Sequence, residues 1–418
     1  SVRQGKFHDF SLDLDLMTIN SCFDWKTVRS QIELMEPNSN SKLPIIVVGA
    51  GAVGVATALA LRRRGEEVLL LEQFFIGHQR GSSHGPSRII RYLYEKERYT
   101  QMMPNAYKLW TQLEAEQNVK LNTKCGILNI SSASRKNIYT EILSKNNLKF
   151  TDKIDDLPVK ESEEFGYVLE EEGGVLDANL CVRASFEQFL KLGGKFMDGF
   201  KLKDFEDDGT IVTVNSEDGK SVQGRKLVLA CGAWAKKILA QTGVEIPLEI
   251  IKTETSYWRV KPEFSAGIID VNNQETGDIY HYYWTPVKEY QNLIKISYHG
   301  TYRDEVDPDE RDDPEKDSKE RAAKQLEDHQ RVIEMHFEGI DSSNPVIVEP
   351  CMYTNTPDND FVLDVHPKMK NVFIGAGFSG HGFKMSPETG EILANLALGE
   401  EIGYDMSFFS VKRFEKSP

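Results

Sequence analysis

An almost uninterrupted apolar run opens the first recognisable unit of the chain, beginning at Ile45. Ile45–Val48 has the β-branched composition of a buried strand, residues 52–64 favour a helix that ends before Gly65, and Val68–Leu71 is a second apolar strand. This order of strand, glycine-rich turn, helix and strand predicts the first half of a Rossmann unit. The alternative is a membrane anchor followed by arginines, but three glycines among the first ten residues and the second strand disfavour it.

The turn of this unit reads Gly-Ala-Gly-Ala-Val-Gly and places glycines at 49, 51 and 54. Gly49 permits the tight turn, Gly51 lets the backbone approach a pyrophosphate, and Gly54 allows close packing of helix and strand. The free N–H groups of the following helix would face the phosphates. Glu72 lies a little over twenty residues after Gly49, where a carboxylate accepts the ribose hydroxyls and repels a 2′-phosphate. The motif therefore predicts FAD or NAD rather than NADP.

Hydrophobic periodicity further along the chain predicts alternating helices and strands. Helices are expected over residues 95–118, 138–148 and 182–192, and strands over residues 121–130 and 251–298. The strand–glycine–helix order returns in residues 226–239 and again in residues 371–397, as in a cofactor domain that resumes after an insertion. Two charge-rich stretches are expected at the surface, namely residues 152–172 and residues 304–334.

Composition narrows the class of protein. A chain of 418 residues with 40% hydrophobic residues suits two intertwined domains, and its net charge of −15 argues against nucleic acid or an anionic membrane as the main partner. The five cysteines are widely spaced and form no CxxC motif, which indicates a reducing compartment and neither a disulfide scaffold nor a metal site. Residues 1–43 lack clear periodicity and carry acidic residues unlike a transit peptide, so we expect a poorly ordered extension.

Two short stretches carry candidate chemistry. Residues 80–94 read as a loop that enters a helix, with Pro86 in its first turn, and they present His84, Arg88 and Arg91 to a flavin or a carboxylate. Strand alternation in residues 294–299 places Lys295, Ser297 and His299 on one face, as a catalytic wall would require. By composition and pattern alone, the alternatives are favoured: a solvent-facing turn with surface arginines, and the solvent face of an edge strand.

Motifs distributed over the chain from about Pro44 to about Phe414 make the resemblance specific. They are LLLEQFF, GSSHGPSRIIR, SYHG, CMYTNTPD and GAGFSGHGFK. With them the chain resembles the monomeric sarcosine oxidase family, most closely the animal peroxisomal sarcosine/L-pipecolate oxidases. The segment from Lys149 to Gly174 is shorter than in those relatives.

The resemblance implies an α/β fold in which a Rossmann-like FAD-binding domain of the D-amino-acid-oxidase/glutathione-reductase type is interleaved with a sheet-rich α+β substrate domain. The implied FAD-binding segments are residues 44–120, 179–250 and 355–418. The implied substrate segments are residues 121–178 and 251–354.

The resemblance also implies roles for individual residues. FAD would be linked through its 8α-methyl carbon to the sulfur of Cys351, whereas a lone cysteine is more often inert packing. Arg91 and Lys384 match a pair that binds the substrate carboxylate, with Tyr283 nearby. His299 matches a histidine beside the substrate amine, and Lys295 matches the lysine that activates oxygen. The remaining residues expected near the cofactor are His84, Ser87, Arg88 and Gly380, together with Lys384.

The implied activity is FAD-dependent oxidation of a secondary amino acid, L-pipecolate and/or sarcosine, with an imine product and reduction of O2 to H2O2. Three alternatives remain open: a flavin dehydrogenase with a protein or quinone acceptor, an NAD-dependent dehydrogenase, and a flavin-binding protein without catalysis. We expect a monomer whose partners are the amino acid and O2, without nucleic acid or membrane. A peroxisomal location follows by resemblance alone, because the last residues lack the family's targeting tripeptide, and a cytoplasmic location is the alternative.

Overall fold

The computed structural model describes residues 42–153, 159–160, 162–261, 267–273, 280–299, 305–316 and 318–415. The extension predicted over residues 1–43 therefore lies outside the described residues, except for its last two.

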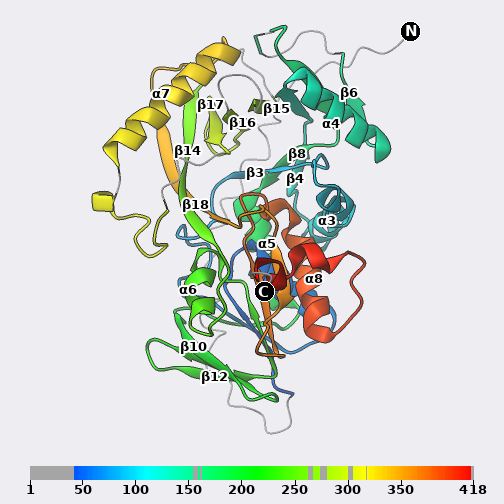
Figure 1. The fold of residues 1–418 in the computed structure, drawn as a ribbon, viewed down its shortest axis with the longest axis vertical. Coiled ribbons are helices and arrows are strands. Elements are labelled where there is room, and N and C mark those ends of the chain that lie inside the picture. The colour runs from blue at the N-terminus through cyan, green and yellow to red at the C-terminus, as the bar shows by residue number, and fades with distance from the viewer. Residues whose placement is uncertain are drawn as a thin grey trace.

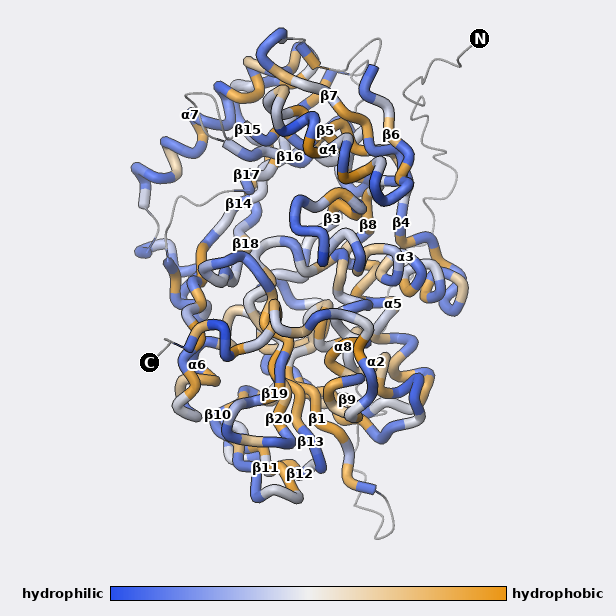
Figure 2. The backbone as a smooth tube through the Cα atoms, turned by 45° about the vertical axis from the view of Figure 1, so that its right-hand side comes forward, coloured by the Kyte–Doolittle hydropathy of each residue, from blue (hydrophilic) through white to orange (hydrophobic). Residues whose placement is uncertain are grey.

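A six-stranded sheet forms the lower half of the molecule (Figure 1), with strand order β19-β20-β13-β1-β2-β9. Its members are β1 (Ile45–Val48), β2 (Val68–Leu71), β9 (Lys195–Met197), β13 (Lys226–Leu229), β19 (Val362–Val365) and β20 (Val372–Ala376). All pairs are parallel except β19 with β20 at the edge. Every side chain of β1 is buried, as expected for a strand covered on both faces, and the strands form an apolar bundle in Figure 2.

Helices cover this sheet. They are α2 (Ala52–Arg63), α3 (Glu97–Gln117), α5 (Ala178–Lys191) and α8 (Ser386–Leu398). The two helices that follow glycine-rich turns, α2 and α8, pack closely: a Cβ on Gly390 of α8 would lie 2.7 Å from the backbone carbon of Ala56 in α2. The cofactor-type units at residues 45–73 and 371–397 thus share one helical layer, although residues 74–370 separate them in the sequence.

An eight-stranded sheet forms the upper half, with order β18-β14-β17-β16-β15-β5-β7-β6. Its strands are β5 (Ile127–Ser131), β6 (Phe150–Thr151), β7 (Gly166–Glu170), β14 (Glu249–Arg259), β15 (Ile268–Asn273), β16 (Tyr280–Pro286), β17 (Leu293–Tyr298) and β18 (Ile347–Asn355). Helix α7 (Lys319–His336) covers one face and packs Val332 and Ile333 into a cluster with Trp258 and Trp284. Helix α4 (Ala133–Lys145) packs near the other end, against β7.

Smaller elements complete the fold. Strands β3 (Ser87–Ile90), β8 (Gly174–Asp177) and β4 (Asn122–Lys124) form a three-stranded sheet in the middle of the molecule, as Figure 1 shows. Strands β10 (Leu202–Asp207), β11 (Val212–Ser216) and β12 (Ser221–Gly224) form another at its lower end. The remaining helices are α6 (Ala235–Ala240), η2 (Gly232–Trp234), η3 (Pro314–Lys316), η4 (Phe383–Met385), η5 (Met406–Phe409) and η6 (Val411–Phe414).

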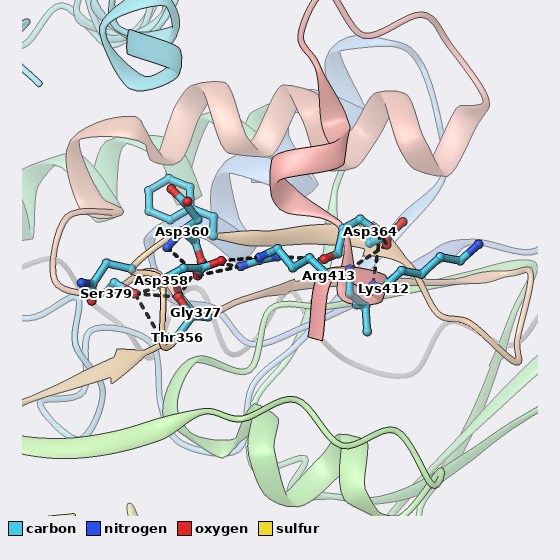
Figure 3. A network of polar contacts seen from close by, with 12 residues as sticks. Thr356, Asp358, Asp360, Asp364, Gly377, Ser379, Lys412 and Arg413 are labelled. Atoms are coloured by element: carbon cyan, nitrogen blue, oxygen red, sulfur yellow. Dashed lines mark hydrogen bonds and ion pairs between the residues drawn. The ribbon is translucent and has the colours of Figure 1, made fainter. Parts of the chain in front are cut away.

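Contacts from the C-terminal segment hold two loops in place (Figure 3). The Arg413 guanidinium donates to the Asp358 carboxylate at 2.8 Å and to the Asp360 carbonyl at 2.8 Å. The amide of Thr356 donates to the Ser379 hydroxyl at 3.2 Å, which joins the loop after β18 to the loop after β20. Both loops border the cavity described below, so this network supports its wall.

Three expectations about local structure are wrong. Residues after Pro86 form β3 rather than a helix, because Ile89 and Ile90 favour a strand and their backbone pairs with β8. The stretch 152–172 is not wholly a surface segment: β7 lies between β5 and β6, and Glu170 is buried. The strand that carries Lys295 is not an edge strand, because β17 lies between β14 and β16.

The other predicted elements are present with shifted ends. The helices expected over residues 95–118, 138–148 and 182–192 are α3, α4 and α5, of which α4 and α5 begin four to five residues earlier than predicted. All strands of the six-stranded sheet come from the three segments assigned to FAD binding, although the two-domain division itself stays a prediction. In the described part of the chain, no helix is long and apolar enough to cross a membrane.

Candidate active site

A cavity of about 870 Å³ lies between the six-stranded and the eight-stranded sheets. One end is lined by the Gly49–Val53 turn and Glu72, and the other by residues of β15, β16, β17 and β18 and by the loop after β20. Its size and shape suit a dinucleotide with room for a small substrate. Of the residues predicted for the site, only Gly54 and Ser87 do not line it.

The glycine turn has the geometry that a dinucleotide requires. Gly49 has φ +100°, and a Cβ there would lie 2.4 Å from the Ala230 carbonyl oxygen. A Cβ on Gly54 would lie 1.7 Å from the Gly49 carbonyl oxygen, so this glycine serves packing rather than contact with a ligand. A Cβ on Gly51 would approach the Ser83 hydroxyl to 3.1 Å, and both residues line the cavity.

Glu72 lies at the carboxyl end of β2, where only 4% of it is exposed. Its carboxylate accepts hydrogen bonds from the amides of Ala50 at 2.7 Å and Phe74 at 3.0 Å. Burial raises the pKa of Glu72, and these amide donors oppose the shift. The carboxylate is thus fixed beside the first glycine turn, in the position of a ribose acceptor.

Arg88 organises the loop that was predicted to contact the flavin. Its guanidinium donates to the carbonyls of Ser87 at 2.8 Å, His84 at 2.7 Å and Ser82 at 3.0 Å. Its charge and burial lower the pKa of His84 to about 3, with burial the larger cause, so this imidazole is neutral. Arg88 therefore shapes the loop through backbone contacts while its guanidinium also lines the cavity.

Lys295 is a buried ammonium in the middle of the eight-stranded sheet. Its Nζ donates to the Ser87 carbonyl at 2.9 Å, and the Ser87 hydroxyl contacts Thr285 Oγ1 at 3.2 Å. Burial, helped by the nearby charge of Arg88, lowers the pKa of Lys295 to about 7. Ser87 thus serves the site by holding Lys295, not by lining the cavity.

Arg91 and Lys384 enter the cavity from two neighbouring elements, the end of β3 and helix η4. Both cations lie over the ring of Tyr94, at 5.6 Å for the Arg91 guanidinium and 5.5 Å for Lys384 Nζ. Burial and the charge of Arg91 lower the pKa of Lys384 to about 7. Arg91 and Lys384, which were predicted to act together, therefore lie close to each other. Arg91 follows strand β3, whereas a helix was predicted there.

Asp270 holds Arg91 in place and was not anticipated. It lies on β15, accepts from Arg91 Nη1, and its other carboxylate oxygen lies 2.5 Å from His281 Nε2. Although burial alone would raise the pKa of Asp270, His281 and Arg91 hold it far below its ordinary value. One carboxylate thus bridges an arginine and a histidine on the cavity wall.

His299 follows β17 and packs among aromatic rings at the same end of the cavity. Its Nδ1 lies 3.1 Å from the Tyr353 hydroxyl, and its ring centroid lies 4.9 Å from that of His281. Burial and the neighbouring His281 hold the pKa of His299 well below 6.5. Gly380, at φ +75°, packs against Tyr353 so closely that a Cβ there would lie 2.6 Å from the Tyr353 ring. Tyr283 lines the cavity from β16.

Cys351 lies on β18, paired in register with Thr253 of β14, and is a free, half-buried thiol at the cavity wall. Cys231 lines the opposite, dinucleotide end, where burial raises its thiol pKa far above its usual range. Cys351 is thus in the same eight-stranded sheet as Lys295.

The residues present fit FAD. The fixed Glu72 and the glycine turn occupy the end where the adenosine and pyrophosphate would lie. Buried polar atoms of cavity-lining residues lack a hydrogen-bond partner within the described ranges, and these include His84 Nε2, Arg91 Nε and Tyr94 Oη. Buried polar atoms are normally paired, so these atoms are available to hydrogen-bond a ligand in the cavity.

Sequence reasoning missed Asp270, His281, Tyr94 and Tyr353. A signal existed for Asp270, because a single acid among the apolar residues 268–271 of β15 is unusual unless it has a partner. Its partners Arg91 and His281 are far away in sequence or on the next strand, so only the fold reveals the cluster.

Comparisons with known proteins agree with this geometry. Residues 44–396 match the family model "FAD dependent oxidoreductase". The peroxisomal sarcosine oxidase of Mus musculus is 39% identical over 387 residues, which cover 88% of this chain and 95% of the mouse protein. A monomeric sarcosine oxidase of a Bacillus species is 32% identical, with 88% of this chain and 96% of that protein covered.

Among solved structures, the amino acid oxidase NikD, essential for nikkomycin biosynthesis, superposes with a TM-score of 0.76 at 22% identity. The match covers 88% of this chain and 97% of NikD, and it shows the shared fold. The resemblance inferred from the motifs is confirmed. The chain belongs to the FAD-dependent oxidoreductase family, within the group formed by the monomeric and peroxisomal sarcosine oxidases.

Proposed function

We propose that the protein is an FAD-dependent oxidase of secondary amino acids, which produces an imine and reduces O2 to H2O2. One observation carries the proposal: the cavity that contains the glycine-rich turn is also lined by the cations Arg91 and Lys384. The buried Lys295 and the free thiol of Cys351 line the same cavity. The relatives' names, sarcosine oxidase, support the same reaction class.

The paired cations supply the binding site for the substrate carboxylate. Lys384 Nζ has no hydrogen-bond partner within the described residues, and Arg91 keeps an unpaired Nε although Asp270 occupies one terminal nitrogen. A carboxylate held between an ammonium and a guanidinium is bound strongly and in one orientation. The amine of the same amino acid then points away from these cations, toward the His281, His299 and Tyr283 wall.

When bound, FAD would supply the hydride acceptor for the carbon next to nitrogen. The chain's own residues position that carbon and exclude water. Lys295, which lines the same cavity, would place its positive charge where O2 gains electrons and so stabilise developing superoxide. Cys351 is the residue we propose for a covalent link to the flavin, because it is a free thiol on the cavity wall at this end.

The alternative is a flavin dehydrogenase with a protein or quinone acceptor. Burial of a lysine without a carboxylate partner costs folding free energy. Within the described residues, Lys295 donates to a backbone carbonyl and has no carboxylate in hydrogen-bond contact. A role in the reaction with O2 would explain why a lysine occupies this position. This supports an oxidase. We further propose that the protein acts as a monomer in peroxisomes, as the relatives' names suggest.

Anaerobic flavin reduction tests the proposed function. Purified yellow protein is mixed with L-pipecolate, sarcosine, L-proline or a primary amino acid such as L-alanine, and flavin absorbance is followed. We expect bleaching by at least one secondary amino acid and much slower bleaching by L-alanine. Bleaching by none of the secondary amino acids would overturn the proposal.

A further inference from the structure

The function proposed above assigns no chemical step to the Asp270–His281 pair. The two residues lie on adjacent antiparallel strands, β15 and β16, and both line the reactive end of the cavity. Because Arg91 and His281 keep the Asp270 carboxyl ionised, that carboxylate can only accept hydrogen bonds. His281 Nε2, 2.5 Å from Asp270 Oδ1, must therefore carry a proton. Its other ring nitrogen, Nδ1, is left as the site that gains or loses one.

A secondary amino acid in neutral solution is a zwitterion, and its nitrogen carries the proton that blocks oxidation. Imine formation needs the nitrogen lone pair, so the ammonium must first lose a proton. The cations Arg91 and Lys384, which hold the carboxylate, also penalise the nearby ammonium. The cavity thus favours deprotonation but requires a group that receives the proton.

We infer that His281, oriented by Asp270, accepts this proton from the substrate ammonium. The substrate N–H bond breaks, its electron pair stays on nitrogen, and the proton bonds to His281 Nδ1. The Asp270 carboxylate stabilises the imidazolium that forms, as a buried carboxylate does for a histidine base. His281 is then the catalytic residue and Asp270 the positioning residue. The inference rests on the proposed function, since it assumes a secondary amino acid as substrate.

The neighbouring histidines suit this role less well. His299 contacts the Tyr353 hydroxyl, and within the described residues it has no carboxylate in hydrogen-bond contact that would stabilise its charged form. His381 contacts the carbonyl of Asn359 at 3.2 Å and packs on Phe361 and Tyr99. Asp270 singles out His281 among the three.

Charged and titratable groups line the same cavity as His281 from several elements. They are Asp270 on β15, Arg91 after β3, Tyr139 on α4, Tyr283 on β16, His299 after β17, Tyr353 on β18, His381 after β20 and Lys384 on η4. Arg91 and Asp270 form an ion pair and offset each other's charge, whereas Lys384, whose pKa burial lowers to about 7, changes its charge near neutrality.

The variant His281→Gln tests the inference. The glutamine amide keeps a donor for Asp270 but has no basic nitrogen. The measurement is the limiting rate of anaerobic flavin reduction by the preferred secondary amino acid between pH 6 and pH 10.5. We expect the variant to be about a hundredfold slower than the wild type at pH 7 and to approach it near pH 10, where the free amine is already neutral.

Two results would overturn the inference: an unchanged pH profile, or a loss of the same size at every pH, which would mean a structural role. If His281→Gln does not accumulate as folded yellow protein, His281→Asn gives the same test with a shorter amide. His366→Gln is the matched control, because His366 contacts Thr242 away from the cavity, and its profile should follow the wild type.

A ligand without an N–H group separates chemistry from binding. Tetrahydropyran-2-carboxylate offers the ring and carboxylate only, and its dissociation constant, read from the flavin spectrum, should change less than threefold in His281→Gln. A larger change would assign His281 to carboxylate binding and contradict the inference. Failure of the wild type with every secondary amino acid would instead refute the proposed function itself.

Discussion

The buried ammonium of Lys295 donates a hydrogen bond to the backbone carbonyl of Ser87 at 2.9 Å. This contact joins the middle of the eight-stranded sheet to β3, the strand that also delivers Arg91 to the cavity. The proposed oxygen-activating group and the proposed carboxylate-binding group are thus positioned by one short segment, residues 87–91.

Lys295→Met should separate the two halves of the reaction. Because the methionine keeps the volume but removes the charge, anaerobic flavin reduction by substrate should stay within a few-fold of wild type. Reoxidation by O2 should slow by about 10²–10³-fold, the usual cost of one lost electrostatic contact. Stopped-flow spectroscopy measures both steps. Lys288→Met, which alters an exposed lysine that contacts Thr123, is the control. Unchanged reoxidation in Lys295→Met would refute the assigned role.

The reaction of the reduced enzyme with O2 should depend on pH through Lys295. Its pKa of about 7 means that the side chain is charged below this pH and neutral above it. The reoxidation rate should therefore fall as pH rises from 6 to 9, with a midpoint near 7, and Lys295→Met should lose this dependence. A rate that increases over this range in the wild type would contradict the assignment.

Arg91→Met should be strongly destabilising for a reason separate from substrate binding. It leaves the Asp270 carboxylate buried without its arginine partner, which typically costs about 3–5 kcal/mol of unfolding free energy. The double variant Arg91→Met/Asp270→Asn should recover most of that stability but not the KM for substrate. Denaturant unfolding and steady-state kinetics on both variants give the comparison. Recovery of KM in the double variant would show that Arg91 does not bind the carboxylate.

Cys351→Ser should abolish covalent flavin attachment. In the wild type, the flavin should remain with the polypeptide after denaturation and fluoresce in a denaturing gel. The serine variant should release it, while Cys231→Ser should retain it, because Cys231 lies at the dinucleotide end of the cavity. A fluorescent band in Cys351→Ser would exclude this cysteine as the attachment site.

Gly380→Ala should damage the wall around His299. The residue has φ +75°, and the added Cβ would lie 2.9 Å from the His299 ring as well as against Tyr353. We expect a loss of about 1–3 kcal/mol in stability from strain and overpacking, together with a marked fall in kcat. Gly399→Ala has a similar φ of +73° but open space around it, so it should cost stability with little change in kcat. Equal kcat values for the two variants would show that Gly380 is not needed to keep His299 and Tyr353 in place for catalysis.

Local patterns in the sequence were sufficient for the cofactor end of the fold. Gly49, Gly54 and Glu72 act within one strand–turn–helix–strand unit, where spacing alone determines which groups meet. The second cofactor unit, residues 371–397, repeats the same pattern. The resemblance also located the cations and Cys351, which all border the cavity.

The substrate end depends on tertiary context that no local pattern contains. Residues 87–90 join β8 as a strand because a partner was available, which overrode the expected helix. Lys295 has a polar pattern typical of a solvent face, yet it is 3% exposed because β14 and β16 flank its strand. Asp270 and His281 become a pair only through the register of β15 and β16.

Simultaneous measurement of O2 uptake and H2O2 release distinguishes an oxidase from a dehydrogenase. With saturating L-pipecolate or sarcosine under air, we expect one H2O2 to form for each O2 consumed and the imine or its hydrolysis product to accumulate in equal amount. Bleaching of the flavin by the amino acid without O2 uptake, relieved by an artificial or quinone acceptor, would contradict an oxidase and identify a dehydrogenase.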